Sequence, residues 1–432
     1  MTAFRGTTAG PELFPAMGPK LRRDMDALFP LIEKTFPVPA RFRRDLASGV
    51  AELSRLLTSG RGERPLSYLN QPPMLSAYLR YFLPWNLYRL CRLLPSLELS
   101  LAPGDRILDL GAGPLTLPIA LWLCRPELRA FPLEFSCLDL SRAALDAGKK
   151  LFAALNGPGG LNGGSPCPWI IKTHSAGGRG PQNPAKGKQN VSLVAVLNMY
   201  NELFQSVSPG NEEGLYRLAR TQGALLASYA GKDGKILVVE PGIPRSGQFI
   251  TLLREVLTGL DHPPLSPCAH GGPCPFPGPA KSAGPRRDTG KGASKWCHFA
   301  FDTQDAPAVL RRLSTAAGLP KERATLSFLL AGPAPEDQRP QDQGPYPRLP
   351  GDQETPSSPV RIISDPFPLG LAQGPREWGR YGCAKEGMTL VRGEKALVES
   401  LPPGTLVRVV FTGRRDPKSG ALLCRPAARP PA

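Results

Sequence analysis

The sequence predicts an α/β protein built around a doubly wound parallel sheet. Between residues 105 and 260, short apolar segments typical of buried strands alternate with longer segments in which apolar residues recur at helical spacing. The first strand, residues 106–110, runs directly into the small-residue loop 111–114 and then into an apolar helix. Glycine lets a loop turn sharply and approach a ligand, and the helix that follows directs free N–H groups to the same place. The loop is therefore predicted to bind a nucleotide-like ligand.

The expected elements follow in order along the chain. Residues 1–104 form a helical N-terminal region, because 21–36, 39–58 and 76–94 carry apolar residues at helical spacing. Strands are expected at 106–110, 134–139, 168–172, 191–197, 235–240, 324–330, 360–364, 388–391 and 405–411. Helices are expected at 114–124, 141–155, 211–228 and 245–260.

Beyond residue 260 the chain divides by composition. It is expected to contain a Cys-rich segment without helix or strand signals at 261–303, a return to the sheet at 304–364 with a disordered insertion at 332–358, a small β-rich piece at 365–412 and a disordered tail at 413–432.

The overall charge favours a polyanionic partner. The 432 residues include 53 Lys and Arg against 36 Asp and Glu, a formal charge of +17, and nucleic acid is the commonest such partner. The alternative is a merely basic surface. No apolar run reaches membrane-spanning length without a charge, and no secretion signal is visible, so we expect neither a membrane span nor export. The nine cysteines are then expected to be thiols or metal ligands rather than disulfides.

Two acids at the ends of neighbouring strands narrow the choice of ligand. Asp109 lies at the end of the first strand and Asp139 at the end of the second. Carboxylates in this position suit a ligand that carries a ribose diol and a positive charge. The loop lacks the third glycine of the NAD fingerprint, since Thr116 occupies that place, and it lacks the Gly-Lys-Ser/Thr of a P-loop. The alternative is an ordinary strand–turn–helix unit with a surface aspartate.

The loop and the two acids resemble motif I and the acidic loop of class I S-adenosylmethionine methyltransferases, over about residues 105–260. The resemblance implies that S-adenosylmethionine is the cofactor and that Asp109, Gly111, Gly113 and Asp139 bind it. Asp139 is placed to accept hydrogen bonds from the ribose hydroxyls. Asp109 is placed under the loop, near the charged part of the ligand.

Two later strand ends carry candidates for the second substrate. Asn198, Asn201 and Glu202 follow the fourth strand, and Glu240 closes the fifth. Ligands of such sheets bind at the C-terminal strand ends, but capping of the loops is an equal alternative. The Asn-Pro-Pro-Tyr sequence of many amino-group methyltransferases is absent, so no catalytic residue is assigned.

The Cys-rich segment has the composition of a metal site. It contains Cys268, His270, Cys274, Cys297 and His298. Such a segment buries little apolar surface, so a bound metal would stabilise it. A closed site needs a fourth ligand, which could be either histidine or Cys383 farther along the chain. Four thiolates suit either zinc or an iron–sulfur cluster.

A second resemblance covers most of residues 15–412. The chain carries, in order, Asp-Leu-Gly-Ala-Gly-Pro, Tyr-Asn-Glu-Leu, Val-Val-Glu-Pro-Gly, Pro-Cys-x5-Cys-Pro and Trp-Cys-His-Phe. This order resembles the Rsm-type, methyltransferase-like proteins associated with the small ribosomal subunit in bacteria and mitochondria. The resemblance implies a [4Fe–4S] cluster held by Cys268, Cys274, Cys297 and Cys383, and small-subunit rRNA as the partner. The chain departs from that pattern in a basic insertion between Cys274 and Cys297 and a Pro-rich insertion before Cys383.

Three functions are compatible with these observations. The first is an S-adenosylmethionine-dependent rRNA methyltransferase that serves ribosome assembly or translation and works mainly by positioning its substrates. The second is a non-catalytic assembly factor that contains an iron–sulfur cluster and keeps the methyltransferase fold. The third is an RNA-binding module stabilised by a metal, with zinc as the alternative to the cluster. In each case we expect a protein that is monomeric outside the ribosome and located in the bacterial cytoplasm.

Overall fold

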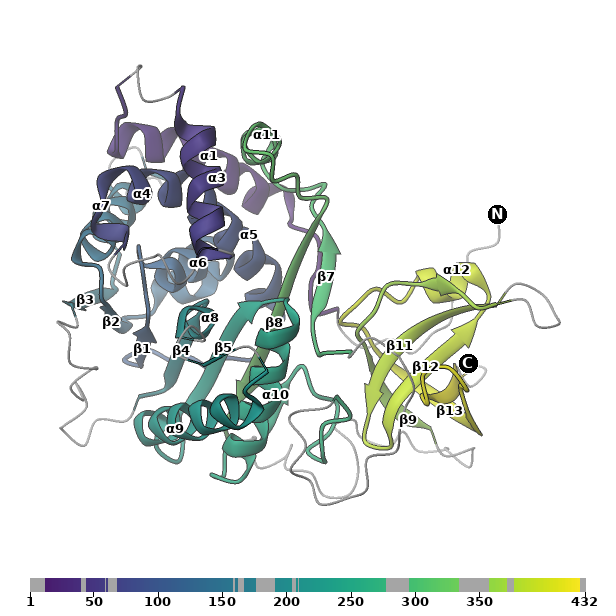
Figure 1. The fold of residues 1–432 in the computed structure, drawn as a ribbon. Coiled ribbons are helices and arrows are strands. Elements are labelled where there is room, and N and C mark those ends of the chain that lie inside the picture. The colour runs from purple at the N-terminus through teal and green to yellow at the C-terminus, as the bar shows by residue number, and fades with distance from the viewer. Residues whose placement is uncertain are drawn as a thin grey trace.

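The computed structural model describes residues 12–39, 44–58, 60, 68–157, 160–161, 167–175, 191–203, 207–208, 210–276, 295–333, 357–370 and 377–427. Within these residues the chain forms an eight-stranded sheet flanked by helices and, toward the C-terminus, a six-stranded sheet. Figure 1 shows the smaller sheet, in green to yellow, beside the larger one. None of the helices in these ranges is long and apolar enough to cross a membrane.

The larger sheet has the strand order β3-β2-β1-β4-β5-β8-β6, and β7 also pairs with β8. Strands β1 to β5 are parallel, whereas β8 runs antiparallel to β5, β6 and β7. The strands are β1 Arg106–Leu110, β2 Glu134–Asp139, β3 Ile170–Ser175, β4 Leu193–Leu197, β5 Lys235–Pro241, β6 Pro264–Ser266, β7 Phe299–Asp302 and β8 Arg323–Ala331. The predicted parallel-rich α/β sheet is confirmed. Its strand order reverses direction between β1 and β4, and ligands of open α/β sheets bind at such a switch point.

Alternate residues of the parallel strands pack against opposite layers of helices. Ile107 and Leu193 belong to one core cluster, while their neighbours Leu108 and Val194 belong to another. The first cluster is completed by α5 Leu83–Leu93, α6 Thr116–Cys124 and α7 Arg142–Asn156. The second is completed by α9 Glu212–Ala230 and α10 Pro244–Thr258. Strands β4 and β5 are buried on both faces and are largely continuous apolar runs, whereas β2 is buried only in part and the edge strand β3 is mostly exposed.

The N-terminal region is helical as predicted, but its boundaries differ. It contains α1 Pro19–Thr35, α3 Leu46–Leu57 and α4 Pro72–Ala77, followed by a π-helical turn at Tyr78–Phe82 that leads into α5. The single helix expected over 76–94 is therefore interrupted. Pro84 lacks an N–H group, and the wider turn just before it accommodates the break in the α-helical hydrogen-bond pattern.

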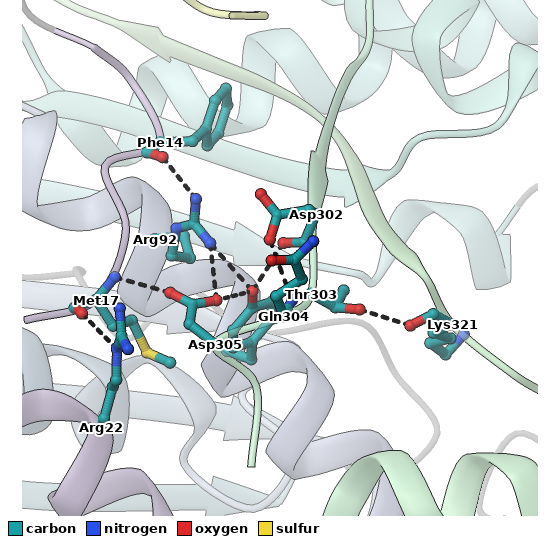
Figure 2. Close-up of polar contacts among 10 residues, drawn as sticks. Phe14, Met17, Arg22, Arg92, Asp302, Thr303, Gln304, Asp305 and Lys321 are labelled. Atoms are coloured by element: carbon teal, nitrogen blue, oxygen red, sulfur yellow. Dashed lines mark hydrogen bonds and ion pairs between the residues drawn. The ribbon is translucent and has the colours of Figure 1, made fainter. Parts of the chain in front are cut away.

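A buried ion pair ties the N-terminal segment to the larger sheet (Figure 2). Arg92 of α5 lies 3.0 Å from Asp305, and both side chains are less than a tenth exposed. Arg92 also donates to the carbonyl of Phe14 at 2.8 Å, and Asp305 accepts from the N–H of Met17 at 2.9 Å. Tyr88 donates its hydroxyl to Asp305 as well. The network holds residues 14–17 against α5 and the loop that follows β7.

The smaller sheet closes into a barrel. Its strands are β9 Ser358–Ile362, β10 Phe367–Pro368, β11 Trp378–Ala384, β12 Gly387–Gly393, β13 Leu406–Arg415 and β14 Leu422–Pro426, with the short helix α12 Lys395–Glu399 between β12 and β13. The order β9-β11-β12-β14-β13 returns to β9, which pairs with both β11 and β13. Val360, Val391, Val407 and Cys424 are among the buried residues that fill the barrel.

Two sequence predictions for the C-terminal half were wrong in part. The segment 261–303 was expected to lack strands, yet β6 and β7 lie in it, and both pair with β8. The tail 413–432 was expected to be disordered, yet it contains the end of β13 and all of β14. Strands β6, β7 and β14 are short, and their partners in the sheets define them. Most of the predicted disordered insertion, 334–356, lies outside the described residues.

Candidate functional site

Three residues with positive φ shape the loop after β1. Gly111, Gly113 and Leu115 have φ values of +72°, +50° and +58°. Helix α6 begins directly after them, at Thr116. A side chain in this left-handed region costs roughly 1–2 kcal/mol, so glycine suits the first two positions. The backbone therefore turns tightly, and α6 begins at the C-terminal edge of the sheet.

The loop is clamped on one side and open on the other. The N–H groups of Gly111 and Ala112 donate to the carbonyl of Leu138 in β2, at 2.9 and 3.0 Å. A Cβ on Gly111 would lie 2.9 Å from the side chain of Met199, in the turn after β4. A Cβ on Gly113 would meet nothing within 4 Å. The open side at Gly113 is therefore where a ligand can approach the backbone.

Asp139 joins this loop to the end of β2. Its Oδ2 accepts from the N–H of Gly113 at 2.8 Å, and its Oδ1 accepts from the N–H of Ser141 at 2.7 Å. Burial raises the pKa of Asp139, although these backbone donors act in the opposite direction. A carboxylate oxygen can accept more than one hydrogen bond, so Asp139 retains acceptor positions for the hydroxyls of a ligand.

Asp109 is the most unusual group at this edge. It is fully buried at the end of β1, and neither carboxyl oxygen has a hydrogen-bond partner among the described residues. Burial, and then the neighbouring charge of Asp139, raises the pKa of Asp109 from 3.8 to about 8. A buried polar group without a partner is destabilising, and such groups gather at functional sites.

The N-terminal region supplies a cover that the sequence did not predict. The 3-10 turn Tyr68–Asn70 spans the strand ends, because Asn70 bonds to the β2 side and Tyr68 to the β4 side. The Oδ1 of Asn70 accepts from the Ser141 hydroxyl at 2.8 Å and from the N–H of Ala143 at 3.3 Å. The Tyr68 hydroxyl donates to Glu202 at 3.3 Å. The only sequence signal was a break in the helical pattern at 68–73.

Tyr78, in the π-helical turn, lies beside the same edge. Burial raises its pKa, and the charges of Glu202 and Asp139 add to this effect. Its hydroxyl accepts from the side-chain amide of Asn86 at 3.4 Å. Tyr68, Asn70 and Tyr78 thus form a wall of the site together with the sheet.

The candidates at the ends of β4 and β5 largely hold their own turn. Glu240 is fully buried and accepts from the N–H groups of Tyr200 and Asn201, at 2.8 and 3.0 Å. Burial raises its pKa to about 8. Asn198 has a φ of +55° and donates its N–H to the carbonyl of Val239 at 2.7 Å. Capping therefore explains Glu240, while Glu202 faces the Tyr68 hydroxyl at the edge of the site.

The four cysteines predicted as ligands converge on one region. Cys268 and Cys274 follow β6, Cys297 precedes β7 and Cys383 lies in β11. Burial raises the pKa of the Cys297 thiol well above its ordinary value, and the charges of Cys274, Cys268 and Cys383 add to this effect. Within the described residues, no three His, Cys, Asp or Glu side chains form a group that could hold a metal ion.

Arg254 of α10 lies among these thiols, and the sequence did not point to it. Its Nε is 3.2 Å from Sγ of Cys268, and its Nη2 donates to the carbonyls of His270 and Gly272 at 3.1 and 2.6 Å. Burial disfavours the charge on Arg254, but the neighbouring cysteines outweigh burial and raise its pKa. His270 places Nε2 3.3 Å from Sγ of Cys383. The cysteine loop is therefore anchored to α10 by a buried cation.

The sequence matches no protein-family model, and no curated protein matches it. Solved structures with a similar fold include a SAM-dependent methyltransferase from Geobacter sulfurreducens in complex with S-adenosyl-L-homocysteine. It is 11% identical with a TM-score of 0.29, covering 66% of this chain and 98% of that one. Geranyl diphosphate C-methyltransferase from Streptomyces coelicolor is 11% identical with a TM-score of 0.28, covering 74% and 100%. A methyltransferase from Pyrococcus furiosus is 10% identical with a TM-score of 0.24, covering 38% and 66%. TM-scores this low leave the function to be judged from the chain's own residues.

Proposed function

We propose that this chain binds S-adenosylmethionine at the C-terminal edge of β1, β2 and β4, and that it is a methyltransferase-like protein acting on or with small-subunit rRNA. The buried, unpartnered carboxyl of Asp109 carries the cofactor proposal. A ligand with a positive charge or a hydrogen-bond donor would relieve the cost of burying this group. S-adenosylmethionine offers a sulfonium, an ammonium and a ribose diol, and Asp139 retains acceptor positions for the diol.

Each residue at this edge of the sheet would have a different role in binding the cofactor. The open backbone at Gly113 and the start of α6 would receive the ligand, and Asp139 would orient the ribose. The turn Tyr68–Asn70 covers the edge from β2 to β4 and would exclude water. When bound, the cofactor would supply an activated methyl group. The chain would contribute mainly by holding the acceptor atom in line with that methyl.

A non-catalytic role is the second candidate, and the turn after β4 favours it. Glu240 is occupied by two backbone N–H groups, so its carboxylate serves the turn rather than a reacting substrate. The rRNA partner is supported by the net charge of +17 and by the sequence resemblance.

One assay separates the two candidates. The full chain is titrated with S-adenosylmethionine and then incubated with labelled S-adenosylmethionine and small ribosomal particles that lack late modifications. Binding followed by transfer of label to rRNA supports an enzyme, and binding without transfer supports an assembly factor. Absence of binding contradicts the cofactor proposal.

We further propose that Cys268, Cys274, Cys297 and Cys383 hold a [4Fe–4S] cluster. Arg254 contacts Cys268 and the His270 carbonyl, and His270 lies against Cys383, so these contacts support a shared site; four thiolates suit such a cluster. Four thiolates also suit zinc, which is the alternative occupant of the site. A cluster would tie β11 of the barrel to the loops beside α10.

Iron, zinc and sulfide analysis of anaerobically purified protein tests this site. Iron and sulfide in equal amounts, about four of each per chain for this cluster type, support the proposal. One zinc per chain with no iron would contradict it.

A further inference from the structure

The strand order of the C-terminal barrel has a recognisable topology. Numbered from its first strand, the closed order β9-β11-β12-β14-β13-β9 is 1-2-3-5-4-1. Strands β12 and β14 are parallel, and every other pair in the ring is antiparallel. Helix α12 lies between the third and fourth strands. This is the arrangement of the OB-fold, a five-stranded Greek-key barrel whose outer face and loops bind oligonucleotides or oligosaccharides.

Fold alone does not fix the ligand, so the choice depends on the side chains. The hairpin between β13 and β14, which corresponds to the fourth and fifth strands, exposes Arg414, Arg415 and Lys418. The acid of this hairpin, Asp416, is occupied by the N–H and hydroxyl of Ser419. The hairpin therefore presents three exposed cations with no exposed acid between them.

A second cationic group lies on the outer face of the same strands. The register pairs Val391 of β12 with Cys424 of β14, and the next residues along, Arg392 and Arg425, lie side by side. Both contact one acid, Glu377, so the group keeps a surplus positive charge. The Arg425 side chain is 65% exposed. Multiple exposed cations on one barrel are suited to consecutive phosphates of a polyanion.

Aromatic and apolar side chains lie beside this group, and Lys295 lies over the Tyr381 ring with Nζ 3.0 Å from the ring centroid. Phe367 and Tyr381 lie with ring centroids 5.0 Å apart, and both pack beside Met388 and Leu390 on the outside of β11 and β12. Both rings are half-buried. OB barrels that bind single strands combine a cationic path for the backbone with aromatic side chains near the bases. An oligosaccharide would not require the surplus of arginine and lysine.

We propose that the C-terminal barrel, residues 357–427, is a binding site for single-stranded RNA, and that Arg414, Arg415, Lys418 and Arg425 contact its phosphates. This inference rests on the RNA partner proposed above and gives that partner a surface, but it does not depend on S-adenosylmethionine. In Figure 1, β13 lies on the side of the barrel turned away from the larger sheet, so a strand bound there would extend outward.

RNA binding by the full chain is measured by fluorescence anisotropy. The probe is a labelled single-stranded RNA of about 15 nucleotides, which is close to the upper site size of one OB-fold. The triple variant Arg414→Ala/Arg415→Ala/Lys418→Ala is expected to bind at least tenfold more weakly. Its slope of log affinity against log salt should be shallower by about 2, since three single-strand phosphate contacts contribute roughly 0.7 each. These side chains are exposed, so the variant should fold.

Matched controls make the result specific. Arg217→Ala/Arg220→Ala/Lys232→Ala removes three exposed cations from α9 and the turn after it, and it should change the affinity less than twofold. The affinity for RNA should also be unchanged when saturating S-adenosylmethionine is added, which separates this site from the cofactor proposal. As a second measurement, crosslinks from 4-thiouridine-containing RNA should map within residues 377–427.

Three results would overturn the inference. They are equal losses in the α9 control and the barrel variant, crosslinks confined to other parts of the chain, and tighter binding of a duplex than of the single strand.

Discussion

Replacing Asp109 by asparagine should stabilise the ligand-free protein while it abolishes cofactor binding. The carboxyl is fully buried, has no hydrogen-bond partner in the part of the chain that the structure describes, and has a pKa raised from 3.8 to about 8. At pH 7 the unfolded chain has released this proton and the folded chain has kept it. That difference lowers the free energy of unfolding by about 4 kcal/mol. An asparagine does not ionise and so avoids this loss, but it leaves an unpaired amide that costs roughly 1–3 kcal/mol. We therefore expect the free energy of unfolding to rise by about 1–3 kcal/mol.

The pH dependence gives the sharper test of the same reasoning. A carboxyl whose pKa is raised by folding destabilises the folded state increasingly as pH rises from about 4 to about 8, by about 1.4 kcal/mol per pH unit. The free energy of unfolding is measured with denaturant for wild type and Asp109→Asn at pH 5, 6, 7 and 8. It should fall less steeply with pH in the variant, because the contribution of Asp109, about 1.4 kcal/mol per pH unit, is missing. Burial also raises the pKa of Glu240 to about 8, so the variant should keep the pH dependence of stability that Glu240 contributes. An unchanged slope, or a variant less stable than wild type at pH 7, would refute the account of Asp109.

Three further predictions follow from the packing and from the cysteine site. Gly111→Ala should lower stability more than Gly104→Ala, by about 1–2 kcal/mol. Both glycines have positive φ, but of the two only Gly111 would place a Cβ against a side chain, at 2.9 Å. Equal losses of stability in thermal unfolding would contradict the clamped loop. Asp305→Ala should lose about 3–5 kcal/mol, since it leaves the arginine of the buried pair without its partner; a loss below about 1 kcal/mol, typical of surface pairs, would count against the network. Cys274→Ser should abolish the brown colour and the iron of anaerobically purified protein, whereas Cys167→Ser, outside the four-cysteine group, should leave both unchanged; iron retained in Cys274→Ser would remove Cys274 from the ligand set.

Much of the larger sheet could be predicted because its signals are local. Strands β1 and β2 match the predicted ranges 106–110 and 134–139, since each is a short segment rich in apolar residues that is followed by a turn and a helical pattern. The loop glycines and the two acids were predictable for the same reason. Their residue types at the end of a strand identify the position that they occupy in the fold.

The missed features depend on distant partners. Strands β6 and β14 contain three and five residues, and neighbouring strands rather than their own sequence define them. Tyr68 and Asn70 reach the site from a region whose only signal was a break in a helical pattern. Arg254 was hidden in an ordinary amphipathic helix, because nothing in the sequence shows that the cysteine loop folds back onto it.

The most direct test of the central claim is isothermal titration of the purified full chain with S-adenosylmethionine, for wild type and for Asp139→Ala. If Asp139 holds the cofactor, we expect saturable binding of one molecule per wild-type chain and at least tenfold weaker binding by Asp139→Ala. A matched Asp146→Ala variant, which removes an exposed acid of α7 that pairs with Arg142, should bind as wild type does. No binding to the folded wild-type chain, or equal binding by Asp139→Ala, would contradict the account.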